Sequence, residues 1–150
     1  MGPAVRGNPL RIFVLLLVIS YFVGEFFIPS YPLFNLLNLI GIMGLILCLA
    51  LFLSSLNLFN SYKENPTPQS NTKRIIKTGI FAYCRNPMYL AMLILQVGIG
   101  MILSMIHIIF FTILTYIVFK YYVIIPEEVY LEKKFKMKYI NYKRLVNRWF

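Results

Sequence analysis

The sequence predicts an all-α integral membrane protein, and two features of its composition support this fold class. Hydrophobic residues make up 59% of the 150 residues, whereas a soluble domain is usually about 45–50% apolar. Charged residues are few and unevenly spread, and residues 86–119 contain no Asp, Glu, Lys or Arg. Because a helix needs about 20 mostly apolar residues to cross the hydrocarbon core, we expect most of the chain to lie in a bilayer. A single membrane-embedded domain is expected over residues 1–150.

About four transmembrane helices are expected, from four apolar segments. These segments are residues 10–28, 33–59, 88–104 and 106–125. Pro29 and Pro32 separate the first two segments, and Pro126 follows the last one; a proline inside a helix removes a backbone hydrogen bond and ends or kinks the helix. Only a residue or two lies between the third and fourth segments, so these two predict a helical hairpin.

The basic residues predict the orientation in the membrane. All of the 15 Lys and Arg residues can be placed on one side, because they lie before the first span, between the second and third, or at and beyond the end of the fourth. Cytoplasmic loops carry such an excess of basic residues. We therefore expect a multi-pass protein with both termini in the cytoplasm. Anionic lipid headgroups are sufficient partners for the net charge of +10, and no nucleic-acid partner is expected.

The tail, residues 126–150, predicts a cytosolic amphipathic helix. Proline at the first turn with acidic residues directly behind it is a helix start signal. Apolar and aromatic side chains then recur at helical spacing, and these are Leu131, Phe135, Tyr139, Tyr142 and Val146. Lysines occupy much of the remaining surface. This pattern is typical of a helix that lies on anionic lipid.

Two short polar motifs flank the predicted hairpin at the same membrane surface. In the first, Asn86 can cap a helix and Pro87 can fill its first position. The second is the pair Glu127 and Glu128, which would be disfavoured among anionic headgroups unless it faces a cation. Helix-start chemistry is one interpretation of both motifs, although it does not fully fit the acidic pair. The alternative is one ligand site, with an anionic group at the helix start and a cationic group at the acidic pair.

A protein-bound metal is not expected. The sequence contains one histidine, His107, and two distant cysteines, Cys48 and Cys84. Metal sites need several such ligands at short spacing.

The order and spacing of these motifs resemble the isoprenylcysteine carboxyl methyltransferase and phospholipid methyltransferase superfamily. Members carry a glycine, an aromatic residue and then Arg-His-Pro-x-Tyr before a span. After a helical hairpin come Glu-Glu, Leu, Phe-Gly, two tyrosines three apart and an end similar to Val-Pro-Arg. The matching residues are Gly79, Phe81, Tyr83, Arg85, Asn86, Pro87, Tyr89, Glu127, Glu128, Leu131, Phe135, Tyr139, Tyr142, Val146 and Arg148. The resemblance covers residues 74–150.

The chain departs from the superfamily pattern at several positions. Asn86 replaces the histidine, Lys136 replaces the glycine after Phe135, and Asn147 replaces the proline before Arg148. Ala91 stands where a glycine is common, and Lys134 stands where an arginine is often found. A lysine keeps the positive charge of arginine but not its bidentate fork.

The resemblance implies an S-adenosylmethionine-dependent methyltransferase that holds its cofactor between the two motifs and under the tail. Carried over residue by residue, the cofactor-binding side chains would be Arg85, Asn86, Pro87, Tyr89, Leu90, Glu127 and Glu128. Methyl transfer from a sulfonium needs alignment in a dry pocket and no metal. The acceptor is expected to be lipophilic, and its negative charge would be held by Arg144, Arg148 and Lys134.

Carboxyl O-methylation is the expected reaction, as in the isoprenylcysteine carboxyl methyltransferases. A carboxylate acceptor needs a cationic clamp and no base, whereas an amine must lose a proton, and two carboxylates beside a sulfonium are weak bases. Three alternatives stay open: N-methylation of a phospholipid amine, an NADPH-dependent membrane sterol or enone reductase, and a non-catalytic membrane scaffold.

Overall fold

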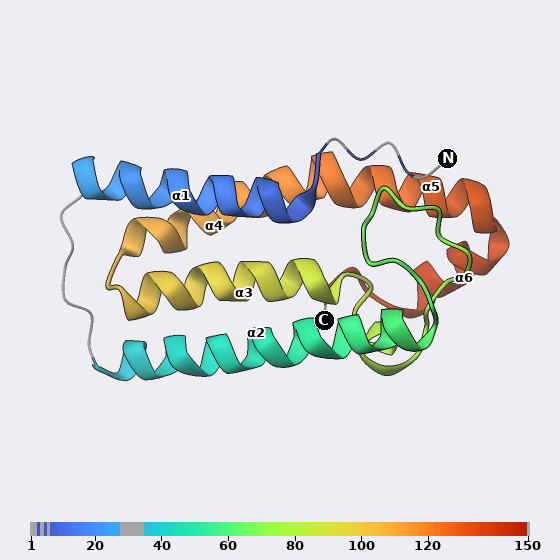
Figure 1. Cartoon of the computed structure of the whole chain (residues 1–150), viewed down its shortest axis with the longest axis horizontal. Coiled ribbons are helices and arrows are strands. Elements are labelled where there is room, and N and C mark those ends of the chain that lie inside the picture. Colours follow the sequence, from blue (N-terminus) through green and yellow to red (C-terminus); the bar gives the residue numbers. More distant parts are fainter. Residues whose placement is uncertain (1–2, 4, 6, 28–34, 150) are drawn as a thin grey trace.

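The computed structural model describes residues 3, 5, 7–27 and 35–149, and within these ranges it contains helices and no strand, which confirms the all-α prediction. The elements in chain order are α1 (Pro9–Phe27), α2 (Asn35–Ser61), a 3₁₀ turn η1 (Gly79–Ala82), α3 (Pro87–Ile102), α4 (Ile106–Phe119), a π-helical segment η2 (Lys120–Ile124), α5 (Ile125–Phe135) and α6 (Met137–Leu145) (Figure 1).

Three helices are long and apolar enough to cross a membrane, namely Pro9–Phe27, Leu36–Ser61 and Ile106–Phe135. The third predicted span is the helix α3, which has 16 residues and is therefore about 24 Å long. This is shorter than a hydrocarbon core of about 30 Å. The predicted end of the first span at Ile28, the predicted start of the second at Leu33 and the two prolines between them lie outside the described residues.

The helices form a bundle around the α3–α4 hairpin. α2 packs against α3, α3 against α4, and α4 against α1 (Figure 1), and residues 103–105 join the two hairpin helices as predicted. α2 and α3 approach closely where Gly41 of α2 faces Gly98 of α3. A Cβ atom on Gly41 would lie only 2.9 Å from the carbonyl oxygen of Gly98, so a larger residue would push the helices apart. Small residues of this kind allow close helix contact in membranes.

The prediction that the fourth helix stops at Pro126 is wrong, because α4, η2 and α5 continue as one helical rod from Ile106 to Phe135. The reason is the π-helical segment before the proline. The backbone N–H of Ile125 donates to the carbonyl of Lys120, five residues back, so the ordinary bonding pattern is already interrupted where Pro126 follows. A π-type turn widens the helix locally and accommodates the missing donor of the proline.

The predicted single amphipathic helix of the tail is two helices, because the chain reverses at Lys136. This residue has φ 48° and ψ −127°, a backbone conformation that favours glycine. α6 consequently folds back along the end of the bundle (Figure 1). The residues of the predicted apolar face nevertheless lie together. Tyr139, Tyr142 and Val146 form a buried cluster against which Leu131, Phe135 and Ile75 pack. This face contacts protein, because the reversal directs it onto the loop that precedes α3.

The backbone of Lys136 generates a stability prediction. Because an L side chain at this φ stores about 1–3 kcal/mol of strain, Lys136→Gly is expected to raise the free energy of unfolding by about 1 kcal/mol, after the larger unfolded-state entropy of glycine is subtracted. The control is Lys133→Gly in the interior of α5, which should cost about 1 kcal/mol. Thermal unfolding in detergent measures both, and a lower melting temperature for Lys136→Gly would contradict the strain argument.

Candidate functional site

The two polar motifs meet at one end of the bundle, which we call the loop end because it carries residues 62–86 and the tail. Arg85, just before α3, lies 3.0 Å from Glu128 in α5, measured from Nη1 to Oε1, and both side chains are buried. The chain brings them together because the α3–α4 hairpin returns to the end of the bundle at which it began (Figure 1). The two motifs are therefore in direct contact through this ion pair.

Glu128 is surrounded by cations. Arg148 binds it through two hydrogen bonds, Nε to Oε1 at 3.1 Å and Nη2 to Oε2 at 2.9 Å. Lys143 Nζ lies 3.6 Å from the same carboxylate. A bidentate arginine–carboxylate pair is strong and directional, and this hydrogen bond raises the pKa of Arg148. The charge of Glu128 is therefore balanced within the protein.

The segment after α6 is held against the start of α3. The carbonyl of Asn147 accepts a hydrogen bond from the backbone N–H of Arg85 at 3.1 Å. The carbonyl of Arg148 accepts from Asn86 Nδ2 at 3.4 Å and from Cys84 Sγ at 3.4 Å. Asn86 is the N-cap residue of α3 and Pro87 lies in its first turn, as predicted, but the Asn86 side chain makes no capping bond because it binds the tail.

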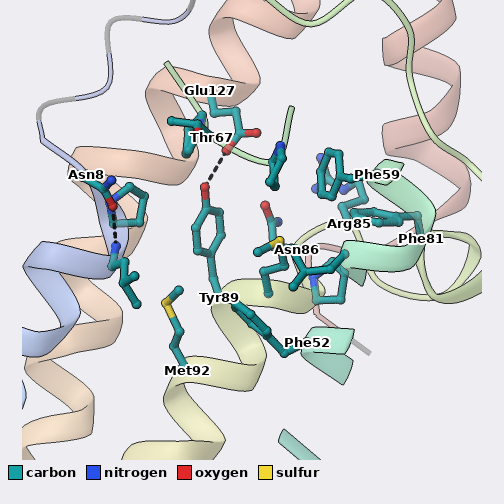
Figure 2. A pocket seen from close by; sticks show the side chains of 17 residues that line it. Asn8, Phe52, Phe59, Thr67, Phe81, Arg85, Asn86, Tyr89, Met92 and Glu127 are labelled. Carbon is teal, nitrogen blue, oxygen red and sulfur yellow. Dashed lines mark hydrogen bonds between the residues drawn. The ribbon is translucent and has the colours of Figure 1, made fainter. Parts of the chain in front are cut away.

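Glu127 has a different environment from its neighbour. Its Oε2 accepts a hydrogen bond from the Tyr89 hydroxyl at 3.0 Å (Figure 2). The ring of Tyr89 packs against Phe119, with ring centroids 5.6 Å apart, so the hydroxyl is held in place by the core. Among the described residues no cation lies within ion-pair distance of Glu127. Its carboxylate is therefore the one of the acidic pair that is available to a ligand.

A cavity of about 230 Å³ lies next to Glu127 and is mostly apolar. Its walls come from the start of α1, the second half of α2, the loop at residues 66–68 and the first turns of α3 (Figure 2). Phe52, Leu56, Met88 and Met92 contribute its apolar lining. Such a lining with a few placed polar groups is typical of a ligand site.

A second cavity of about 80 Å³ lies beneath the tail and is more polar in its lining. Arg74, Glu128, Tyr139 and Tyr142 line it. Burial raises the pKa of Tyr139, so its hydroxyl keeps its proton over the physiological range. The two cavities adjoin, because both have Phe59, Phe81, Arg85, Asn86 and Glu127 in their walls. Glu127 therefore faces an apolar space on one side and a polar space on the other.

Most of the predicted cofactor-binding residues converge on these cavities. The larger cavity is lined by Arg85, Asn86, Pro87, Tyr89 and Glu127, and Glu128 lines the smaller one. Leu90 is not in either wall. It packs with Cys48, Leu51 and Ala91 between α2 and α3, because its position on α3 turns it away from the cavity.

The three predicted acceptor-binding cations do not converge. Arg148 lies at the centre of the site, bound to Glu128. Lys134 is exposed and donates to Asn71 and to the Tyr130 hydroxyl. Arg144 is exposed on α6 and, within the part of the chain that the structure describes, pairs with no carboxylate. Lys134 precedes the reversal at Lys136, and α6 ends at Leu145, between Arg144 and Arg148. The predicted three-cation clamp is therefore not assembled.

Several residues of the site carry no functional signal in the sequence. Lys143 bridges Glu128 and Glu132, at 3.6 and 2.7 Å, but it is one of many tail lysines. Phe52 and Met92 are apolar residues within predicted spans, where periodicity cannot separate a cavity lining from a lipid contact. The loop containing Pro66 and Pro68 covers both cavities, and its composition indicated only a turn.

The buried ion cluster generates a prediction on stability. Glu128→Gln leaves the buried guanidinium of Arg85 without its charge partner, and breaking a buried pair costs about 3–5 kcal/mol. Glu132→Gln is the matched control, because its pair with Lys143 is partly exposed and such pairs contribute about 0–1 kcal/mol. Melting of both variants in the same detergent makes the comparison. Equal melting temperatures would show that the cluster does not hold the tail.

Comparison with known proteins gives one match. A family model of phospholipid methyltransferases matches residues 39–138, a range that contains both polar motifs and the whole hairpin. The searches of curated proteins and of solved structures returned no match. Because the matched range covers most of the chain, the protein belongs to the phospholipid methyltransferase family, within the superfamily that also contains the isoprenylcysteine carboxyl methyltransferases.

Proposed function

We propose that this protein is a membrane methyltransferase that uses S-adenosylmethionine and modifies a lipophilic acceptor at the membrane surface. The family supports methyl transfer. The observation that carries the proposal is the position of Glu127, whose carboxylate lies in the wall shared by an apolar and a polar cavity. A carboxylate without a cationic partner among the described residues suits a ligand that brings positive charge.

The charges of the cofactor match the groups around the shared wall. S-adenosylmethionine has a carboxylate, an ammonium and a sulfonium, and it supplies an electrophilic methyl group for in-line transfer. Glu127 would attract the cationic groups. The start of α3 suits the carboxylate, because Asn86 leaves the first turn uncapped by its side chain and free N–H groups bind anions. Arg85 Nε is buried without a hydrogen-bond partner, which leaves it one donor for a ligand.

The larger cavity suits the apolar part of the acceptor. Its lining combines Pro9 and Leu10 at the start of α1 with Phe52 and Leu56 of α2. α1 and α2 lie on opposite sides of the α3–α4 hairpin (Figure 1). This arrangement supports entry of a lipid acceptor from the bilayer through the space between α1 and α2. The reacting group of that lipid would then point toward Glu127.

An amine is the acceptor group that the charges of the site favour. The sequence-based expectation of a carboxylate acceptor depended on Arg144, Arg148 and Lys134. None of these side chains lines either cavity, and Arg148 is already bound to Glu128. A protonated amine would instead be attracted by the carboxylate of Glu127, which lines both cavities. Carboxyl O-methylation stays the second candidate, because Arg74 lines the smaller cavity with its side chain 58% exposed.

The first experiment measures cofactor affinity. Glu127→Gln is expected to weaken S-adenosylmethionine binding about tenfold, equivalent to about 1.4 kcal/mol, because the neutral amide no longer attracts the cationic groups. Glu132→Gln is the control and should bind as the wild type does. Calorimetry on purified protein in detergent measures both, with NADPH as a second ligand. Binding of NADPH in place of S-adenosylmethionine would favour a reductase, and binding of neither would favour a scaffold.

The second experiment identifies the acceptor group. Membranes that contain the protein are incubated with methyl-labelled S-adenosylmethionine and then treated with mild alkali. An N-methyl group survives alkali, whereas a methyl ester is released as volatile methanol. We expect the label to stay in the lipid, and to be reduced when Glu127→Gln replaces the wild type, because this variant binds the cofactor more weakly. Volatile label would instead establish the carboxylate as the acceptor.

A further inference from the structure

We propose that the outward face of α6 docks on anionic phospholipid headgroups of the membrane in which the chain lies. This face consists of Met137, Lys138, Asn141, Arg144 and Leu145. The inference concerns the surface of the protein and does not depend on the proposed methyl transfer. It also differs from the sequence-based interpretation of the tail, in which the opposite face of the helix would contact the lipid.

The opposite face of α6 is already occupied by protein. Tyr139, Tyr142 and Val146 are buried against Ile75 and their neighbours in the tail. The Tyr142 hydroxyl donates a 2.6 Å hydrogen bond to the carbonyl of Phe81 in η1. Because these side chains are buried, they are not available to the membrane, and any lipid contact of α6 must use the other face.

The outward face combines exposed apolar side chains with positive charge. Leu145 is 85% exposed and Met137 is 58% exposed. Lys138 and Arg144 are exposed beside them, and Lys133 and Lys136 are exposed in the preceding turn. Glu132 is the one acidic residue between positions 129 and 149. Exposed apolar residues next to a cluster of cations fit a surface that is both apolar and anionic, which an anionic bilayer provides.

The position of α6 places this face at the membrane surface. After α6 the chain returns to the bundle (Figure 1), where the ring of Trp149 packs against Tyr116 of α4 with centroids 6.1 Å apart. Tyr116 lies inside the candidate span Ile106–Phe135. Leu145 precedes Trp149 by four residues, which span at most about 14 Å. Leu145 therefore lies near this candidate span, and an exposed leucine beside a span can insert into the membrane interface.

Docking of the outward face would also support the candidate site. The inward face of the same helix contributes Tyr139 and Tyr142 to the smaller cavity. Lys143 and Arg148, in and just after α6, bind Glu128. A membrane that holds α6 in place would therefore hold one wall of this cavity in place. We expect slower backbone hydrogen exchange of residues 137–145 in anionic than in neutral bilayers, because a docked helix opens less often.

The test uses the single tryptophan of the chain. In a Trp149→Phe background, Leu145→Trp places the only indole on the outward face, and the protein is reconstituted in bilayers with brominated phospholipids. We expect strong quenching with phosphatidylglycerol and weaker quenching with phosphatidylcholine. Removing the charges with Lys138→Gln and Arg144→Gln should lower the ratio of docked to undocked helix about fivefold for each charge.

The wild type is the control, because its only indole, Trp149, is held against Tyr116 and does not lie on the outward face, so its quenching should not differ between the two lipids. Wild-type hydrogen exchange of residues 137–145 provides a measurement that needs no substitution. Equal quenching and equal exchange in anionic and neutral bilayers would overturn the proposal. Absence of quenching in both would overturn it as well, and would leave the face open to a soluble partner.

Discussion

The buried ion cluster around Glu128 is the interaction on which the rest of the loop end depends. It joins Arg85 before the hairpin, Glu128 after the hairpin and Arg148 at the end of the tail, each through contacts of 2.9–3.1 Å. Burying these charges is costly, and a buried ion pair is weak evidence of stability in itself. Its directional geometry nevertheless specifies one arrangement of three distant segments. The cavities and the return of the tail follow from that arrangement.

The cluster also separates the roles of two adjacent acids. Successive residues of a helix point about 100° apart, so Glu128 faces the arginines while Glu127 faces Tyr89 and the cavities. The two carboxylates of the acidic pair therefore have different roles. The carboxylate of Glu128 holds segments of the protein together, and the carboxylate of Glu127 faces the cavity in which a ligand would lie. A sequence comparison that treats the two glutamates as equivalent members of a cofactor site would miss this division.

The reversal at Lys136 has the largest consequence for the tail. The superfamily pattern has a glycine at this position, and the positive φ of Lys136 gives a physical reason for it, because a glycine adopts that conformation without strain. With the reversal, the apolar stripe of the tail lies against the protein and a basic, partly apolar face is directed outward. It also places Lys134 in a different helix from Arg144, and the end of α6 at Leu145 separates Arg144 from Arg148.

The sequence by itself determined the membrane class, the hairpin and the two motifs, because these depend on composition and local spacing. Apolar length predicts membrane helices, and the start of α3 at Pro87 follows from the backbone of proline. The tertiary structure decided which residues are in contact. The Asn86 side chain binds the carbonyl of Arg148 and makes no capping bond, Glu128 is neutralised by its cations, and Leu90 faces α2. These outcomes depend on where distant segments meet, which local periodicity does not encode. The continuation of the helix through Pro126 depends on the π-helical turn η2. The direction of the tail depends on the positive φ of Lys136.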